Sequence, residues 1–177
     1  MTKKWCAPKH SLWYYLLAPV WVFALVLLDQ KLKAYAVTEL KGTAGSSLIP
    51  GVLGLEYVEN HGMAFGLLQN ARLFFIIVTV LIFLVFCLAY LAIPEKKRFL
   101  PLSAGIVFMT AGAIGNFIDR VRLGYVIDYL KLEFISFPVF NLADCYLTWI
   151  AVVMALLFVF FYKNEDLEQI KLWKKSA

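Results

Sequence analysis

The segments NFIDR at residues 116–120, GYVID at 124–128 and FNLAD at 140–144 decide how the chain is interpreted. They join two long apolar runs, so three aspartates, two asparagines and an arginine gather beside one membrane surface. Ionisable side chains at membrane depth are costly and tend to be functional. We therefore predict that Asp128 and Asp144 form an acid–base pair and that the rest of the chain brings polar groups to the same surface.

The composition predicts a membrane protein. Of the 177 residues, 62% are apolar and 16% are charged, whereas soluble domains average about 45–50% and about 25%. The net charge of +5 comes from basic residues that flank apolar runs. That pattern is typical of membrane topology and argues against nucleic-acid binding. With only two histidines and three widely spaced cysteines, the chain is predicted to have no metal site, no cofactor and no disulfide framework.

Four apolar runs predict an all-α integral membrane protein with a single domain, residues 1–177. The predicted helices cover 12–28, 73–93, 99–118 and 145–162, with extracytoplasmic loops at 29–70 and 119–143. Glycine, serine and proline mark turns between Gly42 and Gly51, and short strands are predicted at 53–58 and 125–132. These strands predict a small β-like cradle outside the membrane.

A cleaved signal peptide is the alternative for the first apolar run, because AYA at 34–36 resembles a cleavage site. Asp29, Lys31 and Lys33 place three charges where a neutral approach to that site is required. We therefore favour a retained helix.

The basic residues predict the orientation. Lysines and arginines are concentrated in PEKKR at 94–98 and near both chain ends, which predicts that this short loop and both termini are cytoplasmic. Four crossings then place the polar residues at the helix boundaries on the outer face; they are Asp29, Asn60, Asn116, Asp119, Arg120, Asn141 and Asp144.

The two candidate aspartates each have a simpler interpretation. Asp144 lies at the predicted start of the fourth helix, and its simpler role is that of an N-cap without any catalytic function. Asp128 interrupts the apolar alternation of its strand and can be a solvent-facing residue. Taken together, they permit peptide hydrolysis, because two nearby carboxyls share a proton: one deprotonates water and the other protonates the carbonyl oxygen or leaving amine.

The neighbouring polar residues have structural and functional interpretations. Asp119 and Arg120 can form an ion pair at a helix end, or Arg120 can bind peptide carbonyls. Asn116 and Asn141 can satisfy loop backbone or orient the carboxylates. Asp29 and Lys33 stand four residues apart and are predicted to form a local pair.

Five ordered blocks connect these residues. They are DQ at 29–30 with Lys33, N-x-G-x-A-F-G at 60–66, G-A-x-G-N-x-x-D-R at 112–120, G-x-V-x-D at 124–128 and F-N-x-A-D at 140–144. In this order on four apolar runs, they resemble the lipoprotein signal peptidase family, also called signal peptidase II. Ala111 stands where that family usually has glycine, but alanine still permits close helix packing.

The resemblance implies an aspartyl endopeptidase of the bacterial inner membrane. It would cut prolipoproteins just before a diacylglyceryl-modified cysteine, and globomycin-type lipopeptides would inhibit it. Asp128 and Asp144 match the catalytic pair, Asp29 and Lys33 match supporting residues, and the segment 42–60 matches the family's β-cradle. The positions that match the pocket lining are Asn60, Gly62, Asn116, Arg120, Asn141 and Ala143.

The competing class is a non-enzymatic membrane protein, such as a transporter or an assembly subunit. A transport path requires ionisable residues deep within helices. Here they gather at one face, which favours chemistry on a substrate embedded in lipid.

Overall fold

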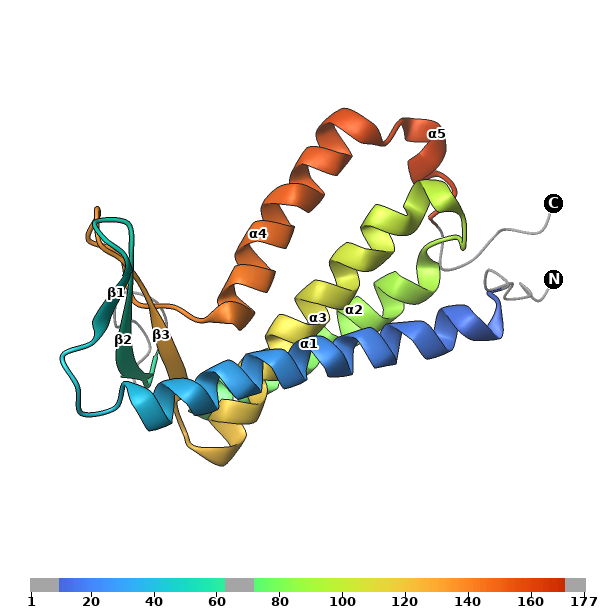
Figure 1. The fold of residues 1–177 in the computed structure, drawn as a ribbon. Coiled ribbons are helices and arrows are strands. Elements are labelled where there is room, and N and C mark those ends of the chain that lie inside the picture. Colours follow the sequence, from blue (N-terminus) through green and yellow to red (C-terminus); the bar gives the residue numbers. More distant parts are fainter. Residues whose placement is uncertain (1–9, 63–71, 171–177) are drawn as a thin grey trace.

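The computed structural model describes residues 10–62 and 72–170. Within these ranges, four helices are long and apolar enough to cross a membrane (Figure 1). They are α1 (Leu12–Glu39), α2 (Arg72–Ala92), α3 (Leu100–Arg122) and α4 (Leu142–Leu156), the last continued by the π-helical turn η3 (Leu157–Phe161). Two short helices, η2 (Lys97–Phe99) and α5 (Asn164–Leu167), lie at the end of the bundle where α4 finishes.

A three-stranded antiparallel sheet lies at the other end of the helices (Figure 1). Its strands, in the order β1-β2-β3, are β1 (Ser46–Ile49), β2 (Leu53–Asn60) and β3 (Val126–Leu132). Gly51, at φ +71°, closes the turn between β1 and β2, a conformation that glycine adopts without strain. The predicted membrane fold with a small β-cradle is confirmed, and β1 is an addition from the segment predicted as turns.

The helices differ from the predicted bounds where charged residues are buried. Helix α1 continues to Glu39 rather than ending at Leu28. Asp29 and Lys33 pair with each other inside the protein, so the helix does not have to end where the charged residues begin. Similarly, α3 extends past Ile118 to Arg122, and α4 begins at Leu142, before Cys145. Asp119 and Arg120, predicted in a loop, therefore lie on α3, and Asp144 lies within the first turn of α4.

Helix α3 lies at the centre and packs against the other three membrane helices. Small residues permit this close packing. A Cβ at Gly112 would lie 2.6 Å from the Ala143 carbonyl oxygen, and one at Gly115 would lie 2.5 Å from Asp29 Oδ2. The glycines of α3 thus let α1 and α4 bring Asp29 and the first turn of α4 against it.

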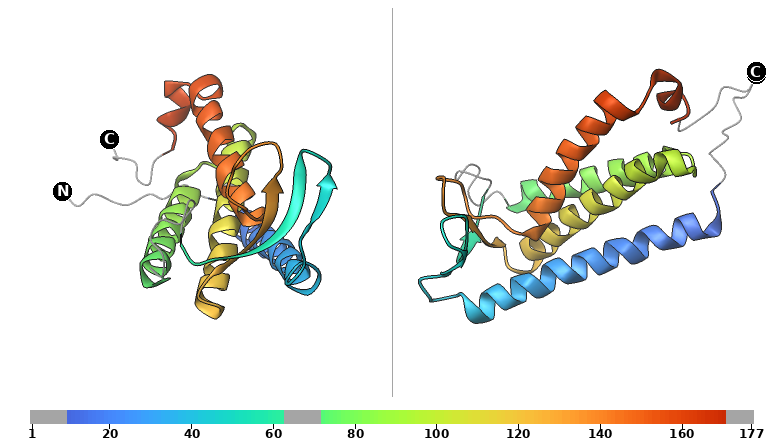
Figure 2. Two further views of the ribbon diagram at one scale, coloured as in Figure 1. Left: turned by 90° about the vertical axis from the view of Figure 1, so that its left-hand side faces the viewer. Right: turned by 45° about the horizontal axis from the view of Figure 1, so that its top comes forward.

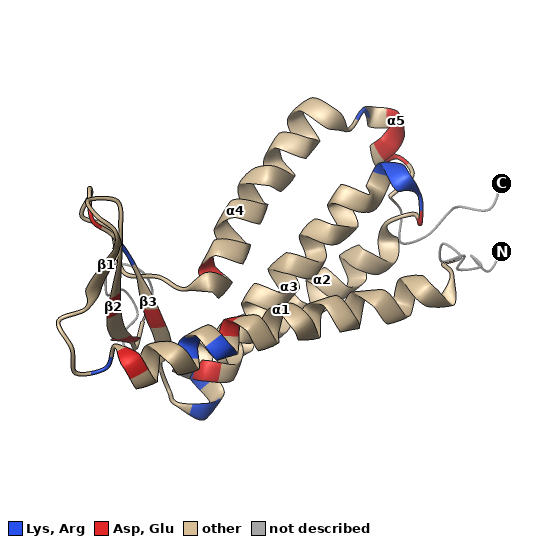
Figure 3. Cartoon of the chain, in the orientation of Figure 1, with Lys and Arg blue, Asp and Glu red and all other residues tan. Residues whose placement is uncertain are grey.

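Charged side chains gather at the two ends of the helices and leave the middle uncharged (Figure 3). At the end opposite the sheet, Arg98 pairs with Asp166 of α5 at 2.7 Å and lies over the Phe161 ring. Near the sheet, α1 around Asp29, α3 around Gly112 and Gly115, and the first turn of α4 come together, while α4 leans away from α1 toward its far end (Figure 2). This convergence positions the candidate site.

Candidate active site

Asp128 lies on β3 and is only 1% exposed, which excludes the interpretation as a solvent-facing strand residue. The side-chain amide of Asn60, on the neighbouring strand β2, donates to Asp128 Oδ2 at 2.8 Å. Asn141 Nδ2 donates to Asp128 Oδ1 at 2.6 Å. Both carboxylate oxygens are therefore held in place by asparagine amides.

The environment of Asp128 favours a bound proton. Burial away from water, together with the nearby charge of Asp144, raises the pKa of Asp128 to about 7, against the effect of its two amide hydrogen bonds. A carboxyl group with this pKa exchanges a proton at neutral pH, as a general acid or base must.

Asp144 occupies the first turn of α4, but it is not the N-cap that the sequence suggested. Asn141 is the N-cap: its Oδ1 accepts from the Asp144 backbone N–H at 3.0 Å, and Asp144 Oδ2 accepts from the Asn141 N–H at 3.2 Å. This reciprocal capping box satisfies free N–H groups at the helix start. The other oxygen, Asp144 Oδ1, accepts from Asn116 Nδ2 at 2.7 Å and is not needed for capping.

Two asparagines link the two aspartates. Asn141 Nδ2 donates both to Asp128 Oδ1 and, at 3.2 Å, to Asn116 Oδ1, while Asn116 donates to Asp144. A continuous chain of side-chain hydrogen bonds thus runs from Asp128 to Asp144. The contacts support orientation of the carboxylates for both asparagines, and Asn141 also satisfies backbone groups, the Asp144 N–H and the Ile127 carbonyl.

Lys33 anchors this chain from α1. Its side chain is 1% exposed, and its ammonium lies 3.0 Å from Asp29 Oδ2, 2.9 Å from Asp119 Oδ2 and 2.9 Å from Asn116 Oδ1. The three contacts match the three donors of an ammonium group. Because Asn116 Oδ1 accepts from Lys33, the Nδ2 of the same amide is turned toward Asp144. The predicted Asp29–Lys33 pair exists, within a larger buried network.

The carboxylates around Lys33 also join separate elements. Asp29 Oδ1 accepts from the backbone N–H of Ala143 at 3.0 Å and so connects α1 to the start of α4. Asp119 Oδ2 accepts from the Ile127 N–H at 3.2 Å and connects α3 to β3. These bonds fix the elements that carry Asp128 and Asp144 relative to each other.

The predicted Asp119–Arg120 ion pair is wrong. Adjacent residues on a helix do not face each other. Asp119 turns toward Lys33, whereas the Arg120 guanidinium lies over the Phe75 ring, 4.6 Å from its centroid, and donates to the Asn116 carbonyl at 3.5 Å.

The remaining predicted residues lie at the same end of the helices. The backbone N–H of Gly62 donates to Asn60 Oδ1 at 3.0 Å and so fixes the amide that holds Asp128. Ala143 is fully buried beside Gly115. The part of the predicted N-x-G-x-A-F-G block from Met63 to Gly66 lies outside the described residues.

A comparison with known families gives a match to the model of signal peptidase (SPase) II over residues 21–161. The chain belongs to the signal peptidase II family. It is 43% identical over 148 residues to the lipoprotein signal peptidase of Streptococcus thermophilus (strain CNRZ 1066), covering 84% of this chain and 94% of that protein. The lipoprotein signal peptidase of Enterococcus faecalis (strain ATCC 700802 / V583) is 40% identical over 153 residues, 86% of this chain and 91% of that protein.

Solved structures agree with this membership. A bacterial membrane enzyme determined by the in meso method at 2.3 Å resolution matches with a TM-score of 0.73 and 29% identity, covering 90% of this chain and 97% of that one. A second, at 1.9 Å resolution, matches with a TM-score of 0.73 and 27% identity, covering 89% and 99%. This member of the signal peptidase II family is therefore a bacterial integral membrane protease.

Two residues of this signal peptidase II chain were not predicted as part of the site. Gln30 Nε2 donates to Asp119 Oδ1 at 3.0 Å and to the Gly115 carbonyl at 3.2 Å. Its place beside Asp29 in the first motif was the available signal. Phe75, beneath Arg120, stands among many phenylalanines in an apolar run, and no sequence pattern distinguishes it.

Proposed function

We propose that this protein removes signal peptides from diacylglyceryl-modified prolipoproteins, cutting just before the lipid-modified cysteine with Asp128 and Asp144 as an aspartyl pair. The observation that carries the proposal is the buried hydrogen-bond chain from Asp128 through Asn141 and Asn116 to Asp144. It holds two carboxyl groups at the end of a membrane helix bundle, where a lipid-anchored peptide would meet water.

The mechanism needs one proton shared by the pair. The ionised carboxylate accepts a proton from water while the water oxygen attacks the scissile carbonyl carbon, and the protonated carboxyl donates to the carbonyl oxygen. The tetrahedral intermediate then collapses: the carboxylate that had donated its proton takes one back from a hydroxyl of the intermediate, the C–N bond breaks, and the leaving nitrogen receives the proton taken from water. The two carboxyl groups exchange the acid and base roles and are regenerated for the next cycle.

The neighbouring residues have supporting roles in this mechanism. Asn60 and Asn141 hold the Asp128 carboxylate, and Asn116 holds that of Asp144. Arg120 interacts electrostatically with both aspartates, and its guanidinium donors can bind substrate carbonyl groups.

Lipid modification of the substrate is expected to control cleavage. The helix surfaces that lead to the site expose large apolar side chains, which suit acyl chains better than a free peptide. Purified protein in detergent should cleave a diacylglyceryl-modified prolipoprotein much faster than the unmodified precursor. The size of the product on gels measures both rates. A globomycin-type cyclic lipopeptide should compete. Equal rates on the two precursors would contradict lipid recognition.

The proposed orientation places the Pro94–Arg98 loop in the cytoplasm and the sheet with the aspartyl pair on the outer face, because short cytoplasmic loops are rich in lysine and arginine. In a background without native cysteines, Ser46→Cys on β1 should react with an impermeant thiol reagent in intact cells. Glu165→Cys on α5 should react only after the membrane is opened. The opposite labelling pattern would overturn the orientation.

A further inference from the structure

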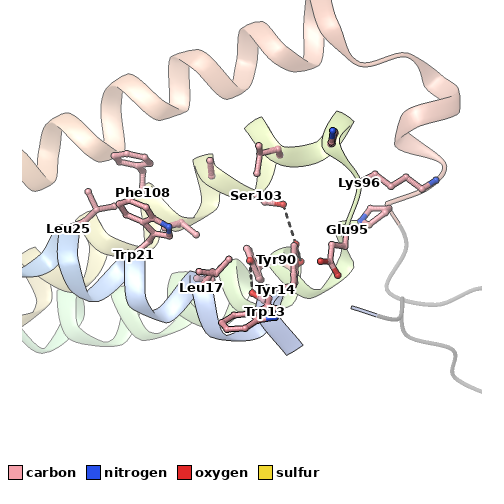
Figure 4. Close-up of a pocket in the computed structure, with 16 residues that line it drawn as sticks. Trp13, Tyr14, Leu17, Trp21, Leu25, Tyr90, Glu95, Lys96, Ser103 and Phe108 are labelled. Carbon is pink, nitrogen blue, oxygen red and sulfur yellow. Dashed lines mark hydrogen bonds between the residues drawn. The ribbon is translucent and has the colours of Figure 1, made fainter. Parts of the chain in front are cut away.

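A hollow opens at the end of the helices opposite the sheet and runs along α1 as far as Leu25, one turn before Asp29. It has a volume of about 700 Å³ and lies between α1, α3 and the connection from α2 to α3 (Figure 4). Sites for small ligands have volumes of about 300–1,000 Å³. None of the residues assigned to the aspartyl site lines this groove.

One face of α1 forms an apolar wall. Trp13, Leu17, Trp21 and Leu25 follow one another at four-residue spacing, and Trp21 and Leu25 lie toward Phe108 of α3 (Figure 4). From Trp13 to Leu25 the wall is about 18 Å long at 1.5 Å per residue. Half of a hydrocarbon core of about 30 Å is about 15 Å, so the groove spans one leaflet. This length fits the acyl chain of one lipid better than a helix that crosses the whole bilayer.

The mouth of the groove is basic. Lys96 and Lys97 line it and are exposed. The Lys96 ammonium donates a hydrogen bond to Oε1 of the neutral Gln169 side chain at 2.6 Å. Glu95 also lies there, but its two carboxylate oxygens accept from the Ser11 N–H at 2.5 Å and hydroxyl at 2.6 Å. The lysine ammonium groups therefore remain available to an anionic group at the membrane surface.

The floor beside the mouth is fixed by hydrogen bonds among three helices. The Tyr14 hydroxyl on α1 donates to the Tyr90 carbonyl on α2 at 3.1 Å and lies 3.2 Å from Ser103 Oγ on α3. The Tyr90 hydroxyl donates back to the Tyr14 carbonyl at 3.1 Å, and the two rings stack with centroids 4.4 Å apart. The groove is thus preformed, and these polar groups already have partners.

We propose that this groove binds one anionic phospholipid, with an acyl chain along Leu17, Trp21 and Leu25 and the phosphodiester headgroup at Lys96 and Lys97. Basic pockets between membrane helices attract anionic headgroups, and tryptophan at the mouth suits the interface. The positive mouth disfavours the other apolar occupant of a membrane, a signal-peptide helix, because its leading segment is itself positively charged. This inference does not rest on the proposed protease mechanism.

Native mass spectrometry of the full chain in detergent tests the headgroup. Phosphatidylglycerol and phosphatidylcholine with identical acyl chains are offered together, and phosphatidylglycerol should be retained at least tenfold more. Each lysine should contribute about fivefold, so K96Q/K97Q should lose most of this preference. Lys163→Gln removes one positive charge just before α5, outside the groove, and it should retain the preference. Equal retention of the two lipids by the unmodified chain, or equal loss in K96Q/K97Q and K163Q, would overturn the site.

A second pair of variants tests the acyl-chain groove. Ala104 is an exposed residue of the lining, so Ala104→Trp should fill the groove and reduce phosphatidylglycerol retention at least tenfold. Ala155→Trp adds the same side chain to an exposed position on α4 outside the lining and should change it less than twofold. Excess inorganic phosphate, which lacks an acyl chain, should not displace the lipid. Displacement by phosphate, or by an apolar helical peptide with a lysine-rich start at equal concentration, would overturn the assignment.

Discussion

Replacing either Asp128 or Asp144 by asparagine is expected to abolish nearly all cleavage of a diacylglyceryl-modified prolipoprotein. Asparagine keeps the size and the hydrogen-bond acceptor of each side chain but cannot exchange a proton. General acid–base catalysis contributes about 10²–10⁴-fold, and both proton transfers depend on this pair. Initial rates with purified variants in detergent should therefore fall by about 10²-fold or more in each single mutant. The double mutant should be scarcely worse, because groups that act as a unit are not additive.

A matched control separates this effect from a general loss of negative charge. Asp166 pairs with Arg98 at the opposite end of the bundle, so Asp166→Asn should keep a rate near that of the unmodified protein. If Asp144 served only the capping box with Asn141, Asp144→Asn would remain active, since an asparagine oxygen can still accept from the Asn141 N–H. A rate for Asp144→Asn close to that of the unmodified protein would show that the aspartyl pair is wrong.

The pH dependence of stability gives a second readout for Asp128. In the folded protein its pKa is about 7, above the unfolded value of about 3.9. A raised pKa means that the contribution to stability is fully present below about pH 4 and is lost as pH rises through 7. Asp128→Asn lacks this loss, so its midpoint of thermal unfolding should exceed that of the unmodified protein at pH 8 and match it near pH 4. An inactive variant that is also more stable at pH 8 cannot owe its inactivity to unfolding.

The sequence predicted the membrane helices and offered candidate site residues because both depend on local pattern. Long apolar runs predict membrane helices whatever packs against them. The candidate site residues are the polar positions of the sequence motifs. Strand β3 was predicted from alternation around Tyr125–Leu132, and the structure has it at Val126–Leu132. The number of membrane crossings was enough to predict that Asn60, Asn116 and Asp144 lie at one end of the bundle.

What could not be predicted depends on partners distant in the chain. Lys33 meets Asp119 and Asn116 across more than eighty residues of sequence, and no local pattern marks that contact. The burial that results lets α1 pass its charged residues without ending, which a composition-based boundary at Leu28 missed. Because Asp119 pairs with Lys33, it does not form the predicted ion pair with Arg120.

Lys33→Met is expected to cause the largest loss of stability of any single change in this network. The substitution keeps an unbranched side chain but leaves Asp29 and Asp119 buried without a counter-charge, at 0% and 2% exposed. Removing one partner of a buried ion pair costs about 3–5 kcal/mol. It also removes the donor that orients Asn116 toward Asp144. The variant should unfold at a markedly lower temperature in detergent, and the fraction that remains folded should cleave substrate more slowly.

Two comparisons isolate the buried charge as the cause. Lys41, on the chain just after α1, pairs with Glu59 at 2.9 Å with its side chain 53% exposed. Such exposed pairs contribute about 0–1 kcal/mol, so Lys41→Met should change the unfolding temperature little. Adding Asp119→Asn to Lys33→Met removes one uncompensated carboxylate and should recover part of the lost stability, although not the orientation of Asn116. Partial recovery of the unfolding temperature without recovery of the cleavage rate is the expected pair of results. Equal unfolding temperatures for Lys33→Met and Lys41→Met would contradict a structural role for the buried lysine.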